Sequence, residues 1–155
     1  MIHSIQKQFI VIFLLSVVVI DAQFALPTFQ AVNSQDWTGP RITITAIASD
    51  NSTIAVTFSE AVYNTSGGSG TLEVADFTLS ISGGSATLAS TTPTSISVSS
   101  NTYTLGISLS GTANGSETLT VRPVDDSIYD AAGNEASTSQ SNNTATLNGT
   151  NYILN

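Results

Sequence analysis

Four of the eleven carboxylate side chains of this chain lie in one stretch, Val124–Glu135. Carboxylate and amide oxygens are the ligands that Ca²⁺ takes in proteins, usually about six to eight at a time. The spacing is not that of an EF-hand loop, and Asp50 or Glu60 from neighbouring loops could complete a site of another type. The stretch therefore predicts a candidate calcium site whose ligands would be Asp125, Asp126, Asp130, Asn134 and Glu135.

The same stretch has a purely structural interpretation. A carboxylate at Asp130 can accept backbone N–H bonds and cap a turn, and Gly133 can take the left-handed conformation that ends it. Glu60 can likewise accept backbone N–H bonds where a strand bends. The acidic corner is then a device that holds two strands together, with or without a cation.

Catalytic chemistry is hard to assemble from this composition. The chain has no cysteine, and its one histidine, His3, lies in a segment that we expect to be removed. Ser-His-Asp and Cys-His arrangements are therefore not available to the mature chain. Asp125 and Asp126 would point to opposite sides of an extended strand, and Trp37 is the only tryptophan. We expect no enzyme activity and no cofactor other than calcium.

The charge balance excludes one class of partner. The chain has three basic and eleven acidic residues and a formal net charge of -8. Nucleic-acid binding needs clustered Lys and Arg, so no nucleic-acid partner is expected. Disulfides are excluded by the absence of cysteine. The expected partners are other surface or matrix proteins, or neighbouring copies of the module.

The N-terminus has the features of an export signal. Lys7 precedes the apolar run Phe9–Ile20, which is too short for the roughly 20 residues that span a bilayer, and the best cleavage point follows Ala22. We expect residues 1–22 to be a signal peptide, with an uncleaved anchor as the alternative, and a secreted or cell-surface location. Contact with a membrane is expected only through this signal. Residues 23–40 then form an extended leader.

From Arg41 onward, apolar and polar residues alternate with a period of two, which is typical of half-buried strands. Gly-rich and Ser-rich turns separate the segments: 82–85 predicts a hairpin, and 72–76 one helical turn. Seven to nine short strands with frequent turns predict an all-β sandwich over residues 41–150, followed by a tail, 151–155. The predicted strands cover 42–46, 54–59, 77–81, 86–88, 96–98, 103–109, 119–121 and 144–147.

Three pieces of the sandwich carry a family likeness. Thr38–Ile44 resembles the entry strand of bacterial Ig-like repeats, Val56–Val62 resembles their second strand, and Asp130–Ala136 resembles their Asp-x-x-Gly-Asn corner. The resemblance covers roughly 38–147 and is closest to modules of surface-layer proteins and adhesins. It implies an Ig-like Greek-key sandwich of seven strands, a surface setting and a spacer or adhesive role, with no catalytic residues.

Two kinds of surface residue suggest further roles. Tyr63, Tyr129 and Tyr152 fall at loop or strand ends, where aromatic rings could bind carbohydrate. Several Asn residues fit the N-x-[ST] pattern of glycosylation acceptors in turns. These candidate glycosylation sites are Asn51, Asn64, Asn114, Asn142 and Asn148.

Three functional hypotheses follow from these observations. The first is a secreted, non-catalytic Ig-like module that acts as a spacer or display domain. The second is an extracellular filament subunit whose leader, 23–40, adds as a strand to the open sheet edge of a neighbour. The third is a calcium-dependent or carbohydrate-binding module.

Overall fold

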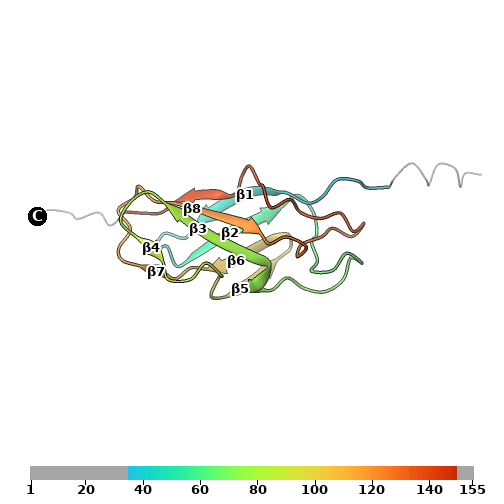
Figure 1. Cartoon of the computed structure of the whole chain (residues 1–155), viewed down its shortest axis with the longest axis horizontal. Helices are drawn as coiled ribbons and strands as arrows, with labels where there is room; N and C mark the ends of the chain where they lie inside the picture. Colours follow the sequence, from blue (N-terminus) through green and yellow to red (C-terminus); the bar gives the residue numbers. More distant parts are fainter. Residues whose placement is uncertain (1–34, 150–155) are drawn as a thin grey trace, which may run out of the picture. The chain divides into compact units, whose positions relative to one another are not determined.

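A computed structural model describes residues 35–149 of the chain (Figure 1). The chain divides into two units, Met1–Gln35 and Asp36–Asn155, and the second contains the whole fold. It is all-β, as the alternation predicts. The predicted signal peptide 1–22, most of the leader 23–40 and the tail 151–155 lie outside the described residues. No helix in residues 35–149 is long and apolar enough to cross a membrane.

The strands form three antiparallel sheets. A four-stranded sheet has the order β1-β2-β6-β5, a three-stranded sheet the order β3-β8-β9, and β4 pairs with β7. A single 3-10 turn, Val74–Asp76, precedes β3, where the sequence predicts one helical turn. The strands are β1 Ile42–Ile47, β2 Thr53–Phe58, β3 Phe77–Ser82, β4 Thr87–Leu88, β5 Ile96–Ser99, β6 Thr102–Gly106, β7 Leu109–Ser110, β8 Thr118–Pro123 and β9 Thr144–Thr146.

One hydrophobic core lies between the two larger sheets. Phe58 and Tyr103 from the four-stranded sheet meet Phe77 from the three-stranded sheet, with ring centroids 6.2 to 6.4 Å apart across the two sheets. Leu105 and Val121, from opposite sheets, are fully buried. Inward residues of both sheets therefore share one interior, which is the arrangement of a β-sandwich.

The alternation of β1 changes phase inside the strand. Ile42 pairs with Phe58, but Ile44 pairs with Thr57, so a bulge at Thr43 inserts one residue. Because side-chain direction has a period of two, the insertion turns Ile44 outward, and this side chain is 61% exposed. The even spacing of Ile42 and Ile44 in the sequence gives no sign of the bulge.

Two predictions about connections are wrong. Residues 82–85 do not close a hairpin, because β3 pairs with β8 whereas β4 pairs with β7. The segment instead carries the chain from one sheet to another, with Gly83 and Gly84 both at positive φ. The predicted long strand 103–109 is also broken: β6 ends at Gly106, and the separate strand β7 begins at Leu109.

Candidate functional site

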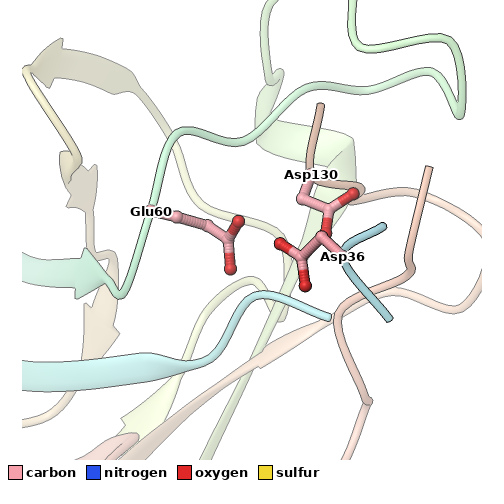
Figure 2. Close-up of side chains that lie close together, drawn as sticks. All are labelled: Asp36, Glu60 and Asp130. Carbon is pink, nitrogen blue, oxygen red and sulfur yellow. The ribbon is translucent and has the colours of Figure 1, made fainter. Parts of the chain in front are cut away.

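Three carboxylates meet at one end of the sandwich. Asp36, Glu60 and Asp130 each have a carboxylate oxygen within 4.8 Å of the others. Figure 2 shows the three groups directed toward one another from three separate segments of the chain. It is the only group of three or more acidic, His or Cys side chains at metal-binding spacing in residues 35–149.

Asp36 is fixed by the corner that follows β8. Its main-chain carbonyl accepts a bond of 3.0 Å from the Asn134 side chain, and its carboxylate accepts the Thr38 N–H at 2.9 Å. Three residues further on, Gly39 lies so close to the Glu135 carbonyl that a Cβ there would be 2.0 Å from it. Residues 36–39 are therefore packed against the sandwich, although the sequence predicts a leader up to residue 40.

Asp130 has the capping geometry that the sequence predicts. Its Oδ1 accepts the N–H groups of Ala132 and Asn134, both at 2.8 Å, and its Oδ2 accepts the Asn134 side chain at 2.8 Å. Gly133 has φ +89, the left-handed conformation that closes the turn. Burial alone would raise the pKa of the Asp130 carboxyl, but these donated bonds outweigh it and lower the pKa.

Glu60 has the opposite electrostatic character. Partial burial raises the pKa of its carboxyl, and the negative charges of Asp130 and Asp36 raise it further. Its carboxylate accepts a weak bond from the Ser59 hydroxyl at 3.4 Å. The cluster thus contains Asp130, whose carboxylate accepts several hydrogen bonds, and Glu60, whose negative charge is disfavoured by its surroundings. A cation between the two carboxylates would relieve the repulsion between their charges.

Three of the predicted calcium ligands, Asp125, Asp126 and Glu135, lie outside this cluster, whereas the Asn134 side chain bonds both the Asp130 carboxylate and the Asp36 carbonyl. Glu135 accepts the Asp126 N–H at 2.6 Å, and the Asp126 carboxylate accepts the Tyr129 hydroxyl at 3.4 Å. Asp50 accepts both the N–H and the hydroxyl of Ser52 in its own turn. Within the described residues, the cluster contains Asp130 and Glu60 but not Asp125, Asp126 or Glu135. Sequence reasoning missed Asp36, because no spacing rule links it to residue 130.

Sequence reasoning also missed the most deeply buried carboxylate, Glu117, which is 0% exposed. It accepts N–H bonds of 2.8 to 3.1 Å from Ser85, Ala86, Asn114 and Gly115. These bonds, with Ala86 first, lower the pKa of the carboxyl to about 2 against the cost of burial. The only available signal was a lone acid directly after a Gly-containing turn, at the start of a strand.

Two of the three candidate tyrosines and the candidate glycosylation sites lie within the described residues. Tyr63 and Tyr129 exchange backbone bonds of 2.8 Å, and Tyr63 lines a pocket described below. Asn51 and Asn148 bond each other through their side chains, so both amide nitrogens are already used. Asn142 is exposed in a loop. Tyr152 lies outside the described residues.

An apolar pocket of about 270 Å³ opens beside β5. Its walls include Val62, Leu72, Ile96, Val98 and Tyr103. A second, more polar hollow of about 370 Å³ lies along Pro40, Arg41, Glu135 and Gln140. Neither pocket contains the three clustered carboxylates.

Comparisons with protein-family models, with curated proteins and with solved structures found no match for this chain.

Proposed function

We propose that the chain is a secreted or cell-surface Ig-like module with a non-catalytic, structural or adhesive role, which spaces or displays what is attached to it. The observation that carries the proposal is where the chain enters and leaves the sandwich. Asp36 lies beside Glu60, just past the end of β2, whereas Asn148 bonds Asn51, just before β2 begins. The six residues of β2 separate these points by about 20 Å.

Entry and exit at opposite ends suit a spacer, because successive attachments are then held apart by the length of the domain. Figure 1 displays this arrangement within the described residues, with the start of β1 and the segment after β9 at opposite ends. The family likeness in Thr38–Ile44 and Asp130–Ala136 supports the same role.

The first and last segments of the sandwich are also bonded side by side. The Ile42 N–H donates to the Gln140 side chain at 2.9 Å, and the Thr45 hydroxyl donates to the Asn142 carbonyl. The Asn51–Asn148 pair follows further along. Both segments run in the same direction, so tension applied through the two ends loads these bonds together in shear.

Location is the first test of this proposal. Antibodies against the sandwich should label intact cells, and external protease should remove the label without cell lysis. Protein found only in the cytosolic fraction would contradict the proposal. A version that lacks residues 1–22 is the matched control and should stay inside the cell.

Calcium binding is a second candidate function, favoured by the approach of Asp36, Glu60 and Asp130. Hard oxygen ligands and a surplus of negative charge suit Ca²⁺, and water or a main-chain carbonyl would complete its coordination. Millimolar calcium should then raise the unfolding temperature, and a chelator should reverse the rise. The variant Asp36→Asn should lose the response, whereas Asp125→Asn, outside the cluster, should keep it. An unchanged midpoint in the wild type would remove the metal.

A further inference from the structure

Strand β5 is an edge of the four-stranded sheet, and it differs from the edge strands β1 and β3 in what covers it. The outer side of β1 is bonded by the Gln140 side chain at Ile42. The outer side of β3 is bonded by the Thr91 carbonyl at Leu79. Among residues 35–149, no such bond from another segment reaches Ile96 or Val98 of β5.

The register of the sheet shows which backbone groups this edge presents. In an antiparallel sheet, alternate residues bond to the strand on either side. The Phe58 N–H bonds the Asn101 carbonyl, so odd-numbered residues of β6 face β2, and the Gly106 N–H bonds Ser95 on the other side. Ser97 and Ser99 of β5 therefore bond to β6, and the N–H and C=O groups of Ile96 and Val98 point outward.

The side chains at this edge face the core but are incompletely covered. Ile96 lies opposite Leu105 and Val98 opposite Tyr103, and directly opposed side chains share one face of a sheet. Leu105 is fully buried, yet Val98 is 58% exposed. The pocket of about 270 Å³ opens beside Ile96 and Val98, where other residues do not cover the two side chains fully.

The edge also lacks the usual protection against pairing. Charged side chains, proline and bulges are what normally keep an exposed edge strand from adding another. β5 has none of these, and no charged residue occurs from Phe77 to Ser116, in a chain whose formal net charge is -8. Two copies that meet through this neutral region avoid the repulsion that other approaches would meet.

We propose that β5 pairs with β5 of a second copy of this chain, antiparallel and about a two-fold axis at Ser97. Ile96 then lies opposite Val98 of the second copy, and the outward N–H and C=O groups of both residues are paired. Two four-stranded sheets become one continuous sheet, and the two apolar pockets adjoin. This interface does not use the leader and goes beyond the proposed spacer role.

A two-fold contact is self-complementary, so the association closes at a dimer. Because β5 has only four residues, the contact belongs to the small class of interfaces, below about 1,200 Å² of total buried surface. A dissociation constant on the order of micromolar is expected for such a contact.

The absence of cysteine makes a position-specific test available. In the proposed register, Ser97 faces Ser97 of the second copy in a non-hydrogen-bonded pair, where Cα atoms are about 4.5 Å apart, within disulfide range. The full chain with Ser97→Cys should form a disulfide-linked dimer on mild oxidation. In the matched control Ser99→Cys, the two sulfurs belong to residues separated by about 13 Å, and cross-linking should be at least tenfold slower.

Sedimentation of the full chain gives an independent test. Val98→Lys should weaken self-association at least tenfold, whereas Ile44→Lys, on the opposite edge and equally exposed, should leave it unchanged. Equal cross-linking at positions 97 and 99, or equal sedimentation of the two lysine variants, would overturn the proposal. A monomer in which the Ile96 and Val98 amides still resist hydrogen exchange would also overturn it, and would assign the edge to another segment of the same chain.

Discussion

At the scale of single residues, two carboxylates show how the surroundings can shift the pKa of the same chemical group in opposite directions. Glu117 is buried but accepts N–H bonds from two turns, which favours its charged form. Glu60 is only partly buried but faces two like charges, which disfavours its charged form. Burial alone therefore does not decide whether the charged form of a carboxylate is favoured; the hydrogen-bond donors and charges around it also count.

Glu117→Gln should destabilise the sandwich strongly. The amide replaces one acceptor oxygen by a donor that faces backbone N–H groups, and it leaves buried donors unpaired. We expect the unfolding temperature to fall on the order of 10 °C, measured by circular dichroism. Asp125→Asn, at an exposed position of the same charge, is the control and should change it little.

Lowering the pH should reduce the folding stability of the wild type through protonation of the same residue, Glu117. The pKa of the Glu117 carboxyl is about 2 in the folded chain and 4.5 in its ordinary environment. The carboxylate therefore contributes stability above pH 4.5, and this contribution is lost as the pH falls from about 4.5 toward 2. In Glu117→Gln, unfolding temperatures measured across that range should fall less steeply than in the wild type. Parallel curves for the two proteins would contradict the account.

Glu60→Gln, unlike Glu117→Gln, should raise the unfolding temperature at neutral pH when no calcium is present. Because the pKa of the Glu60 carboxyl is raised, the folded chain loses stability as the pH rises through and above 4.5. Removing the charge should raise the unfolding temperature at pH 7 on the order of 2 °C in a chelator, and change it little at pH 3.5. If calcium binds, the same variant should lose the calcium-induced rise.

At the scale of elements, strand existence could be predicted and strand connection could not. The period of two found all the main strands, because burial on one face of a sheet acts directly on alternate residues. The hairpin predicted at 82–85 was wrong because Gly-rich turns also serve crossings between sheets. Here Gly84 lies against the Glu117 side chain, where a Cβ would be 2.1 Å from its carboxyl carbon. That contact joins residues far apart in the sequence.

The candidate site was predictable in part for the same reason. The Asp130–Gly133 turn is local, and its residue types indicate its geometry. The meeting of Asp130 with Asp36 and Glu60 depends on how three distant segments pack. The exposure of Ile44 likewise depends on a bulge that the alternation does not encode.

The bonds between the first and last segments yield a prediction at this scale. The Asn51 side chain bonds both the side chain and the backbone of Asn148, and the Asn148 side chain also donates to the Ala48 carbonyl. A double-mutant cycle with Asn51→Gly and Asn148→Ala should give a coupling free energy of about 1 kcal/mol in denaturant unfolding. Glycine suits position 51, where φ is +60. Asn142→Ala is the control, because only the backbone carbonyl of Asn142 is used. Additive effects of the two changes would show that the pair is not coupled.

At the scale of the whole sandwich, one core, one carboxylate cluster and one uncovered edge have separate places. In the proposed spacer, the core between the sheets would give stiffness, and the parallel bonds between the first and last segments would resist tension along the strands. The cluster lies where the chain enters, at the end of β2. β5 and β1 are the two opposite edges of the four-stranded sheet. Association through β5 would therefore leave both the entry and the exit of the chain free.

Single-molecule pulling tests the spacer account most directly, since cysteine handles can be placed at will in this cysteine-free chain. Handles at Thr38→Cys and Thr150→Cys load the first and last segments in shear; Gly149 is avoided because a Cβ there would lie 2.6 Å from the Asn114 carbonyl oxygen. Handles at Thr38→Cys and Ser139→Cys pull two points at the same end and open the bonds one after another. The account predicts a clearly higher unfolding force in the first geometry. Equal forces in the two geometries would contradict it.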